Sequence, residues 1–151
     1  MRGAGPEALA QHRLSPRERA IDAFLQDLMS SPKLVRVAFM FGYDVHRLRT
    51  SYPHLPALQE GGAWGGAAGD NVVEILKLAR KLHTQVRKMR KRRPPLKDIH
   101  KRVLKTYMDK EQQCSDWAQR PLTQAQVDYA AKDGHSVVMM LDHLVQKHPS
   151  A

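Results

Sequence analysis

Two short apolar segments, each followed at once by a helical pattern, constrain the fold of this chain more than any other feature. The first is LVRVAFMF (34–41) and the second is NVVEILKL (71–78). Both are short and contain β-branched residues, which favours buried strands over helices. Because strands and helical segments alternate along the chain, the sequence predicts an α/β fold.

Helical patterns lie on both sides of the first segment. Ser15-Pro16 fits an N-cap followed by proline at the first helical position. The helix predicted from there to about residue 31 has an apolar stripe of Ile21, Phe24, Leu25 and Leu28. Residues 1–14 read as a loose N-terminal tail before a domain over 15–148. A second helix is predicted from Gly42 to Pro53.

Residues 53–70 are rich in proline and glycine and read as a flexible insertion. The glycines do not form a phosphate loop, because no Gly-Lys-Ser/Thr follows them.

The C-terminal half is predicted to be rich in helices. A basic helix is expected over 78–93 and an amphipathic helix over 96–108, with Tyr107 in its apolar stripe. The last helix is expected from the N-cap Thr123 to about Gln146. Its predicted core face consists of Val127, Ala130, Ala131, Gly134, Val138, Leu141 and Val145.

The charge balance points to a polyanionic partner. The 151 residues contain 25 Lys and Arg against 15 Asp and Glu, a formal net charge of +10. Nucleic acid is the first candidate and an acidic membrane surface the second. The single cysteine, Cys114, excludes a disulfide framework within the chain. No secretory signal and no membrane-spanning run is found, so we expect a soluble intracellular protein.

The positive charge is concentrated between Lys77 and Lys105, where 13 Lys and Arg accompany one acid, Asp98. Such side chains can contact phosphates without reading sequence. A nuclear localisation signal, which would place the protein in the nucleus rather than the cytoplasm, and a merely solvated helix face are the alternatives. We rank nucleic-acid contact first because the charge is of one sign. The candidate contacts are Arg87, Lys88, Arg90, Lys91, Arg92 and Arg93.

Tyr129 and Asp133 lie one helical turn apart, with Cβ atoms about 5–6 Å from each other. A lone Tyr-x-x-x-Asp arises often by chance. Here, however, the pair ends an ordered series that begins with Ser115, Trp117 and Arg120-Pro121-Leu122. The composite resembles the third motif of the DEDDy 3′–5′ exonucleases, the ribonuclease D and Werner-exonuclease type.

A second match lies upstream. VRVAFMFGYDVHRLRTSYP (35–53) resembles the second motif of that family and places Asp44 at the motif's aspartate. Residues 71–79 resemble the next family strand, with Glu74 in place of a commoner aspartate. The resemblance covers residues 18–146 and implies a ribonuclease H-like fold. It also implies phosphodiester hydrolysis with two metal ions, Mg²⁺ or Mn²⁺.

The resemblance implies a role for each matched residue. Asp133 would bind the metal that activates water, Tyr129 would orient that water, and Asp44 would support the second metal. A simpler interpretation is also open. Asp44 would then be only an acid at a helix N-terminus, where the helix dipole favours it, and Tyr129 and Asp133 would be relics.

The first family motif, Asp-x-Glu on the first strand, has no counterpart before Asp44. The only Asp-x-Glu is Asp109-Lys110-Glu111, which falls in the connector before Ser115. We therefore expect a fold truncated at its N-terminal end, weak metal binding, and little or no activity from this chain alone. A partner strand or a missing N-terminal segment would cover the apolar edge of 34–41.

Three functions are weighed on this basis. The first is a 3′–5′ exonuclease domain that acts on 3′ ends of RNA or DNA when the first motif completes it. The second is a catalytically inactive remnant that binds nucleic acid or protein. The third, a basic helical module unrelated to nucleases, is disfavoured by the two motif matches in their family order.

Overall fold

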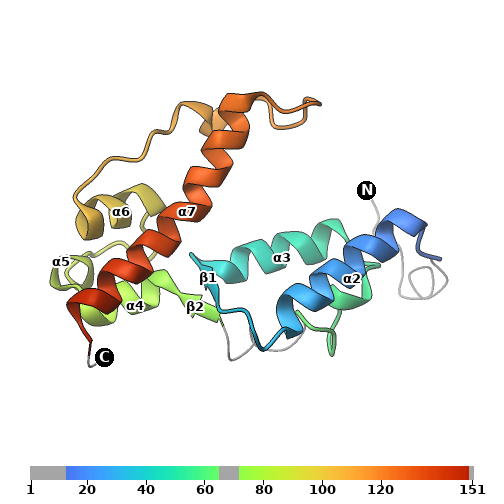
Figure 1. Ribbon diagram of the computed structural model, residues 1–151, viewed down its shortest axis with the longest axis horizontal. Coiled ribbons are helices and arrows are strands. Elements are labelled where there is room, and N and C mark those ends of the chain that lie inside the picture. The colour runs from blue at the N-terminus through green and yellow to red at the C-terminus, as the bar shows by residue number, and fades with distance from the viewer. Residues whose placement is uncertain (1–12, 65–71, 150–151) are drawn as a thin grey trace. The chain divides into compact units, whose positions relative to one another are not determined.

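The computed structural model describes residues 13–64 and 72–149 (Figure 1). The chain divides into two compact units, Met1–Arg36 with Met40–Val73 and Val37–Phe39 with Glu74–Ala151. The predicted tail lies outside the described residues as far as residue 12. Leu14, its last residue, packs against the core of the first unit.

The first unit contains helix α2 (Pro16–Ser30), helix α3 (Phe41–Ser51) and the 3₁₀ helix η1 (Pro56–Leu58). The predicted start of α2 is confirmed by a capping box. The Ser15 hydroxyl accepts from the Glu18 N–H at 3.3 Å, and the Glu18 carboxylate accepts from the Ser15 N–H at 2.7 Å. Asp44 lies in the first turn of α3.

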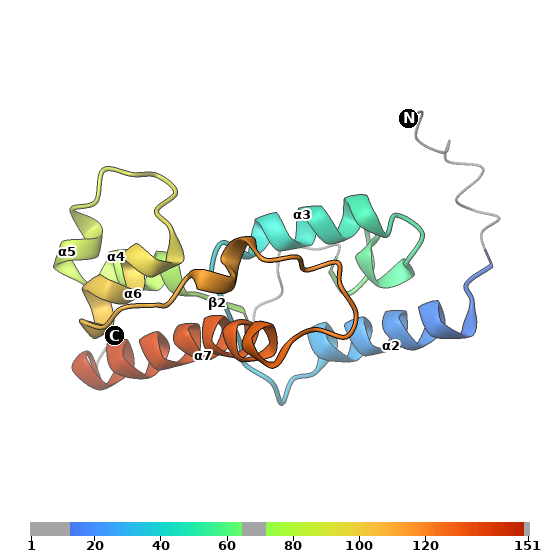
Figure 2. The same cartoon turned by 90° about the horizontal axis from the view of Figure 1, so that it is seen from above.

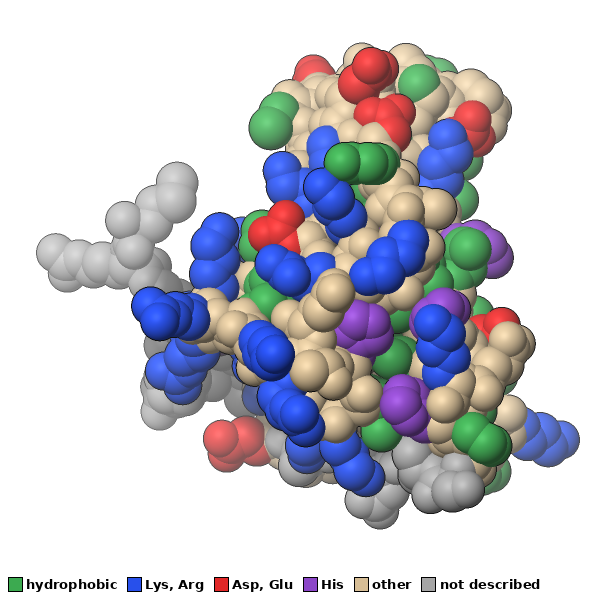
Figure 3. Space-filling view, turned by 90° about the vertical axis from the view of Figure 1, so that its left-hand side faces the viewer, with side chains coloured by type: hydrophobic (Ala, Val, Ile, Leu, Met, Phe, Trp, Pro, Cys, Tyr) green, Lys and Arg blue, Asp and Glu red, His purple; other side chains and the backbone are tan. Residues whose placement is uncertain are grey.

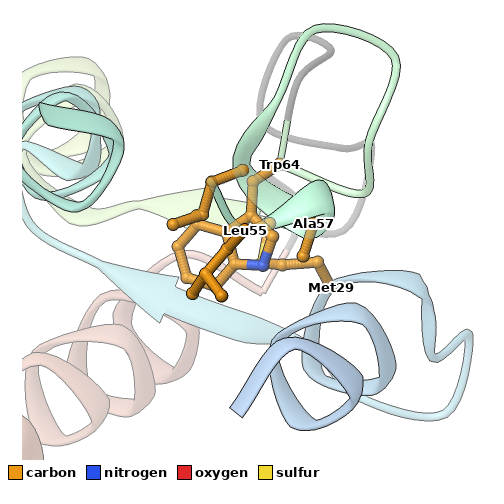
Figure 4. Packing of buried hydrophobic residues seen from close by; sticks show 5 residues of the cluster. Met29, Leu55, Ala57 and Trp64 are labelled. Carbon is orange, nitrogen blue, oxygen red and sulfur yellow. The ribbon is translucent and has the colours of Figure 1, made fainter. Parts of the chain in front are cut away.

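The core of the first unit is built largely from the segment that was expected to be a flexible insertion. Leu55, Ala57, Leu58 and Trp64 are buried together with Met29 of α2 (Figure 4). The Trp64 indole N–H donates to the Leu25 carbonyl at 2.8 Å. The expectation of a flexible insertion is therefore wrong for residues 53–64, and residues 65–70 lie outside the described residues.

Close packing in this segment also requires a glycine at position 62. A Cβ built on Gly62 would lie 2.3 Å from the Pro56 carbonyl oxygen, closer than real Cβ contacts. The glycine therefore lets the chain turn back against η1.

The buried face of α2 matches the predicted stripe only in part, since Leu25 and Leu28 pack against the core. Phe24 is 63% exposed and Ile21 38% exposed, whereas Asp22 and Met29 are buried. The reason is a polar contact, because the Asp22 carboxylate accepts from the Ala57 N–H at 2.7 Å and from the Gln26 amide at 2.7 Å. The hydrogen bond to the Ala57 N–H places Asp22 on the buried side of α2, so the buried face is rotated relative to the apolar stripe.

The strands are shorter than predicted. β1 (Arg36–Ala38) and β2 (Val72–Glu74) have three residues each and pair in a two-stranded sheet. Leu34 and Val35 are 47% and 66% exposed, so the segment 34–41 is not buried over its length. Helix begins already at Phe41 and at Ile75. The predicted alternation of strand and helix is present, but helix dominates.

The second unit contains three helices before the long helix α7 (Gln124–Lys147). These are α4 (Ile75–Leu82), α5 (Thr84–Arg87) and α6 (Leu96–Leu104), followed by the 3₁₀ helix η2 (Glu111–Cys114). α4 and α6 both contact α7 (Figures 1 and 2). The predicted Thr123 cap is confirmed, again as a capping box. The core side chains are Ile75, Ala79, Val86, Ile99, Val103, Met140 and Leu144.

The basic helix expected over 78–93 is interrupted. α4 ends at Leu82, α5 ends at Arg87, and the chain is non-helical up to the fully buried Pro94. The Arg80 guanidinium donates to the carbonyls of Lys91 (2.8 Å) and Arg92 (3.0 Å). Like charges on successive turns destabilise a helix, and here the segment instead folds back onto α4.

The predicted core face of α7 is also wrong. Val127, Val138 and Val145 are 46%, 50% and 53% exposed, and Ala130, Ala131 and Gly134 are exposed as well. The buried residues are Gln126, Ser136, Val137, Met140 and Leu144. Among the described residues, no helix meets the length and hydropathy needed to cross a membrane.

Replacing Asp22 by alanine tests the polar contact in the first core. The variant leaves the buried Ala57 N–H without its acceptor, so we expect the free energy of unfolding to fall by about 1–3 kcal/mol. Urea denaturation measures it. The control is Asp27→Ala on the same helix, where the side chain is exposed. Equal losses in both variants would contradict the assigned role.

Candidate functional site

Tyr129 and Asp133 lie side by side on α7, and the ammonium group of Lys110 bridges them. Its Nζ lies 3.0 Å from the Tyr129 hydroxyl oxygen and 2.9 Å from Asp133 Oδ1. The side chains of Lys110 and Asp133 are 22% and 34% exposed. The carboxylate that the sequence singled out therefore already has a cation against one of its oxygens.

The charge of Lys110 is stabilised by these partners. Partial burial acts to lower the pKa of Lys110, but the hydrogen bonds to Tyr129 and Asp133 and the negative charge of Asp133 outweigh it. The pKa of Lys110 is consequently raised, and the side chain is an ammonium at neutral pH. The Tyr129 oxygen accepts a hydrogen bond from it, which leaves the phenolic O–H free to donate elsewhere.

Trp117, in the connector before α7, packs against Tyr129 and helps to hold it in place. Its indole N–H donates to the Gln112 carbonyl at 3.0 Å, and its ring lies 5.9 Å from the Tyr129 ring. Trp117 thus packs within the connector and against the Tyr129 ring. Arg120 in turn donates to the Trp117 carbonyl at 3.0 Å.

The buried amide of Gln126 holds the connector to the helix. Gln126 is 1% exposed, and its amide N–H₂ donates to the Ser115 hydroxyl (3.1 Å) and the Asp116 carbonyl (2.9 Å). Its oxygen accepts from the Thr123 N–H at 2.9 Å. The ordered series from Ser115 to Asp133 is thus a set of contacts that orients Tyr129.

A cavity of about 300 Å³ opens beside Asp133. Its inner wall includes His100, whose ring nitrogens lie 2.7 Å from the Ser136 hydroxyl and 2.8 Å from the Thr106 hydroxyl. Burial, and then the positive charge of Lys110, lower the pKa of His100. The remaining lining residues are Tyr107, Met108, Asp109, Lys132, Asp133, His135, Ser136 and Met139.

Tyr107 corrects a further expectation, since it is 81% exposed and not part of the core. The Lys101 ammonium lies 4.5 Å from the centroid of its ring. A hydrogen bond from Lys101, together with its charge, lowers the pKa of Tyr107.

Asp44 belongs to the first unit, whereas Tyr129 and Asp133 belong to the second. Its place in the first turn of α3 agrees with the interpretation as a helix N-terminal acid. Within residues 13–64 and 72–149, no three His, Cys, Asp or Glu side chains are grouped so that they could hold a metal ion. Within the described residues of the second unit, Asp133 with the Lys110 ammonium against it does not by itself fit a two-metal site.

The sequence interpretation missed Lys110. It considered Asp109-Lys110-Glu111 only as an Asp-x-Glu outside its expected place. In the structure, Asp109 accepts from the Glu111 N–H at 2.9 Å. The lysine between the acids contributes to the site instead. No spacing rule links it to Tyr129 and Asp133, which lie 19 and 23 residues further along the chain.

The six basic residues proposed as phosphate contacts lie at the end of α5 and in the segment after it. Arg87, Lys88, Arg90, Lys91, Arg92 and Arg93 are all exposed. The segment is held by the contacts from Arg80, so its side chains extend from a fixed stretch of backbone.

Comparisons with known proteins give a consistent result. Residues 6–148 match the family model described as 3′–5′ exonuclease. The human protein "Exonuclease mut-7 homolog" is 31% identical over 131 residues, which cover 87% of this chain and 15% of that protein. This chain thus spans a small part of the length of that relative.

Two crystal structures are similar. The Nibbler EXO domain of Aedes aegypti has a TM-score of 0.68 at 17% identity, covering 91% of this chain and 62% of that one, and it shows the exonuclease fold. The EXD2 exonuclease domain soaked in Mn has a TM-score of 0.34 at 21% identity, covering 85% of this chain and 62% of that one.

Replacing Lys110 by methionine tests its position against Asp133. Removing the ammonium takes away a positive charge that opposes cation binding. We therefore expect the affinity for Mn²⁺ to rise about two- to fivefold, which corresponds to the free energy of one partly exposed ion pair. Paramagnetic broadening of α7 amide signals around Asp133 measures the affinity. Lys132→Met, which removes a neighbouring charge not bonded to the pair, is the control. Equal affinities in the two variants would contradict the assigned contact.

His100 predicts a dependence of stability on pH. Because its pKa is lowered in the folded state, the unfolded chain takes up the proton first as pH falls. The contribution of His100 is complete above about pH 6.5 and decreases as pH falls from there towards the folded pKa. His83 and His143 act in the same direction. His100→Gln should therefore lose less stability between pH 7 and pH 5 than the wild type, as measured by urea unfolding at each pH. An identical loss would refute this.

Proposed function

This chain belongs to the 3′–5′ exonuclease family, and from that premise we propose that it binds single-stranded nucleic acid and contributes Tyr129, Asp133 and Asp44 to a 3′-end hydrolysis site. Carboxylates from outside this sequence complete that site. The observation that carries the proposal is the Tyr129–Asp133 pair, which buried connector contacts hold in one orientation.

Each residue has a proposed part in the reaction. The Tyr129 O–H, whose oxygen already accepts from Lys110, donates to the attacking water or to a phosphate oxygen. The carboxylates of Asp133 and Asp44 are hard oxygen ligands of the kind that Mg²⁺ and Mn²⁺ prefer. Those ions supply Lewis-acid chemistry when bound.

By itself, the chain is proposed to bind without cleaving. The only Asp-x-Glu of the sequence is used in the connector, and Asp133 is paired with Lys110. A non-catalytic domain that binds nucleic acid or protein is thus the second candidate function. The exposed basic segment 87–93 supports nucleic-acid binding in both candidate functions. It equally suits a nuclear localisation signal.

Exposed apolar surface supports the need for a partner segment. On α7, the side chains of Val127, Val138 and Val145 are about half exposed along one stripe. In the first unit, Leu34 and Val35 before β1 are exposed as well. Apolar surface of this kind is typical of an interface. A strand or segment from outside this sequence would cover it.

Cleavage and binding assays with one oligonucleotide test the function. We expect no Mn²⁺- or Mg²⁺-dependent release of nucleotides from a 3′-labelled single strand. Binding of the same strand should weaken with salt, with a log–log slope of about −0.7 per phosphate contact. Release that Asp133→Asn abolishes, but Asp128→Asn on the same helix does not, would show that the chain contains a complete site. Absence of salt-dependent binding would refute the proposed function.

A further inference from the structure

A second group of cations lies at the C-terminal end of α6, outside the segment 87–93. Lys101, Arg102 and Lys105 line a cavity of about 430 Å³ together with Gln85 and Asp98. Asp98 is the only acid among these lining residues. Within the described part of the chain, none of the three cations forms an ion pair with a carboxylate. Lys105 donates to the Gln85 amide oxygen at 3.2 Å, and Lys101 lies over the Tyr107 ring.

Further basic groups converge on this end from two other elements. His83 lies between α4 and α5, while His143 and Lys147 belong to α7 and His148 follows it. Burial first, and then the charges of Lys105 and Lys147, lower the pKa of His83. Burial and the same two lysines lower the pKa of His143, against which only Asp142 acts. Among the described atoms, His83 Nδ1 and His143 Nε2 are buried without a hydrogen-bond partner.

Figure 3 shows the side of the molecule that carries α4, α5 and α6. Lys and Arg side chains gather over much of this face, with few acids among them, and several His side chains lie beside them. The surface has the character expected of a site for a polyanion.

The helix dipole explains only part of this arrangement. Cations in the last turn of a helix are favourable, which accounts for Lys101 and Arg102. It does not account for the backbone of Lys105, the C-cap of α6, which lies in the left-handed region at φ 63°, a conformation that is uncommon for a residue with a side chain. Nor does it account for basic groups that approach from α7. The like charges of Lys101, Arg102 and Lys105 at the end of α6 and of Lys147 on α7 repel one another, and a bound anion would relieve that repulsion.

We propose that the phosphate backbone of a single-stranded nucleic acid binds at the C-terminal end of α6, on Lys101, Arg102 and Lys105, and extends towards Lys147. The choice of nucleic acid as the polyanion rests on the proposed function. From Asp133 to Lys147, α7 rises by about 21 Å at 1.5 Å per residue. At 3.4 Å per stacked nucleotide, about six nucleotides span that length. A strand whose 3′ end lies at Asp133 reaches Lys147 with the nucleotides upstream of the end.

The test measures binding as a function of oligonucleotide length. Single strands of two to ten nucleotides with a 5′ fluorophore are titrated in anisotropy experiments. The variant K101Q/R102Q/K105Q is compared with R13Q/R17Q/K33Q, which removes the same charge from exposed positions of the first unit. Circular dichroism checks the fold of each. The single variant Arg102→Gln is a second probe, since no described hydrogen bond depends on its side chain.

For the wild type, affinity should rise with length up to about six nucleotides and then level off. The α6 variant should bind the ten-nucleotide strand about tenfold or more weakly, with a salt slope smaller by about 2, as expected for three lost phosphate contacts. Arg102→Gln should show about a third of that change in slope. The first-unit variant should stay within about twofold of the wild type. Equal losses in both triple variants, or none in either, would overturn the site.

Histidine titration provides a second readout. A bound phosphate backbone opposes the charges of Lys105 and Lys147, so the pKa values of His83 and His143 should rise when the ten-nucleotide strand is added. Ring-proton NMR measures this. Unchanged values with a bound strand would place the strand elsewhere.

The outcomes distinguish this site from the proposed function. If the wild type binds no oligonucleotide, the proposed function fails. If it binds in a salt-dependent way and the α6 variant binds equally well, only the α6 site fails. Binding to phosphatidylserine vesicles without binding to oligonucleotides would overturn the choice of nucleic acid as the partner.

Discussion

The buried amide of Gln126 determines the rotation of α7, and most of the second unit depends on it. An amide in an apolar environment is tolerated only when its donors and acceptor are satisfied. Ser115, Asp116 and Thr123 satisfy Gln126, and these contacts draw the connector across the helix. With Gln126 facing inward, residues three and seven positions further along, Tyr129 and Asp133, lie near the same side of the helix. The apolar stripe of Val127, Val138 and Val145 consequently turns towards solvent.

Features that depend on neighbouring residues, such as helix caps, are predicted correctly from the sequence. Features that depend on distant residues, such as the buried faces of helices, are not. Both predicted caps, at Ser15 and Thr123, are present because a capping box needs only residues within one turn. The predicted buried face is wrong for α7 and half wrong for α2, where Leu25 and Leu28 do pack against the core, and one reason applies to both helices. Asp22 and Gln126 bond to segments far along the chain or to the connector, and counting apolar residues gives such polar groups no weight. In the same way, the composition of 53–64 indicated a loop, while its aromatic and leucine side chains form a core.

The family resemblance located Tyr129 and Asp133 correctly on the last helix, but it carried no information on the charge beside them. Lys110 comes from a connector with no regular pattern, and its contact exists only because the chain after α6 returns across α7. The resemblance also could not place Asp44 relative to this pair. A sequence motif identifies the side chains that a reaction requires. Whether those side chains can bind a cation also depends on the charges around them.

Among the described residues of the second unit, two classes of cation can be distinguished by whether an acidic partner compensates their charge. Lys110 has an acidic partner, so its charge is locally compensated and it opposes a second cation at Asp133. Lys101, Arg102 and Lys105 have no acidic partner among the described residues. Burial, together with the charges of Lys105 and Lys147, lowers the pKa of His83 and of His143. Uncompensated charge is a source of binding energy only for a ligand that brings the opposite sign. Net charge alone, at +10, would not separate these classes, because it counts Lys110 and Lys105 as equal.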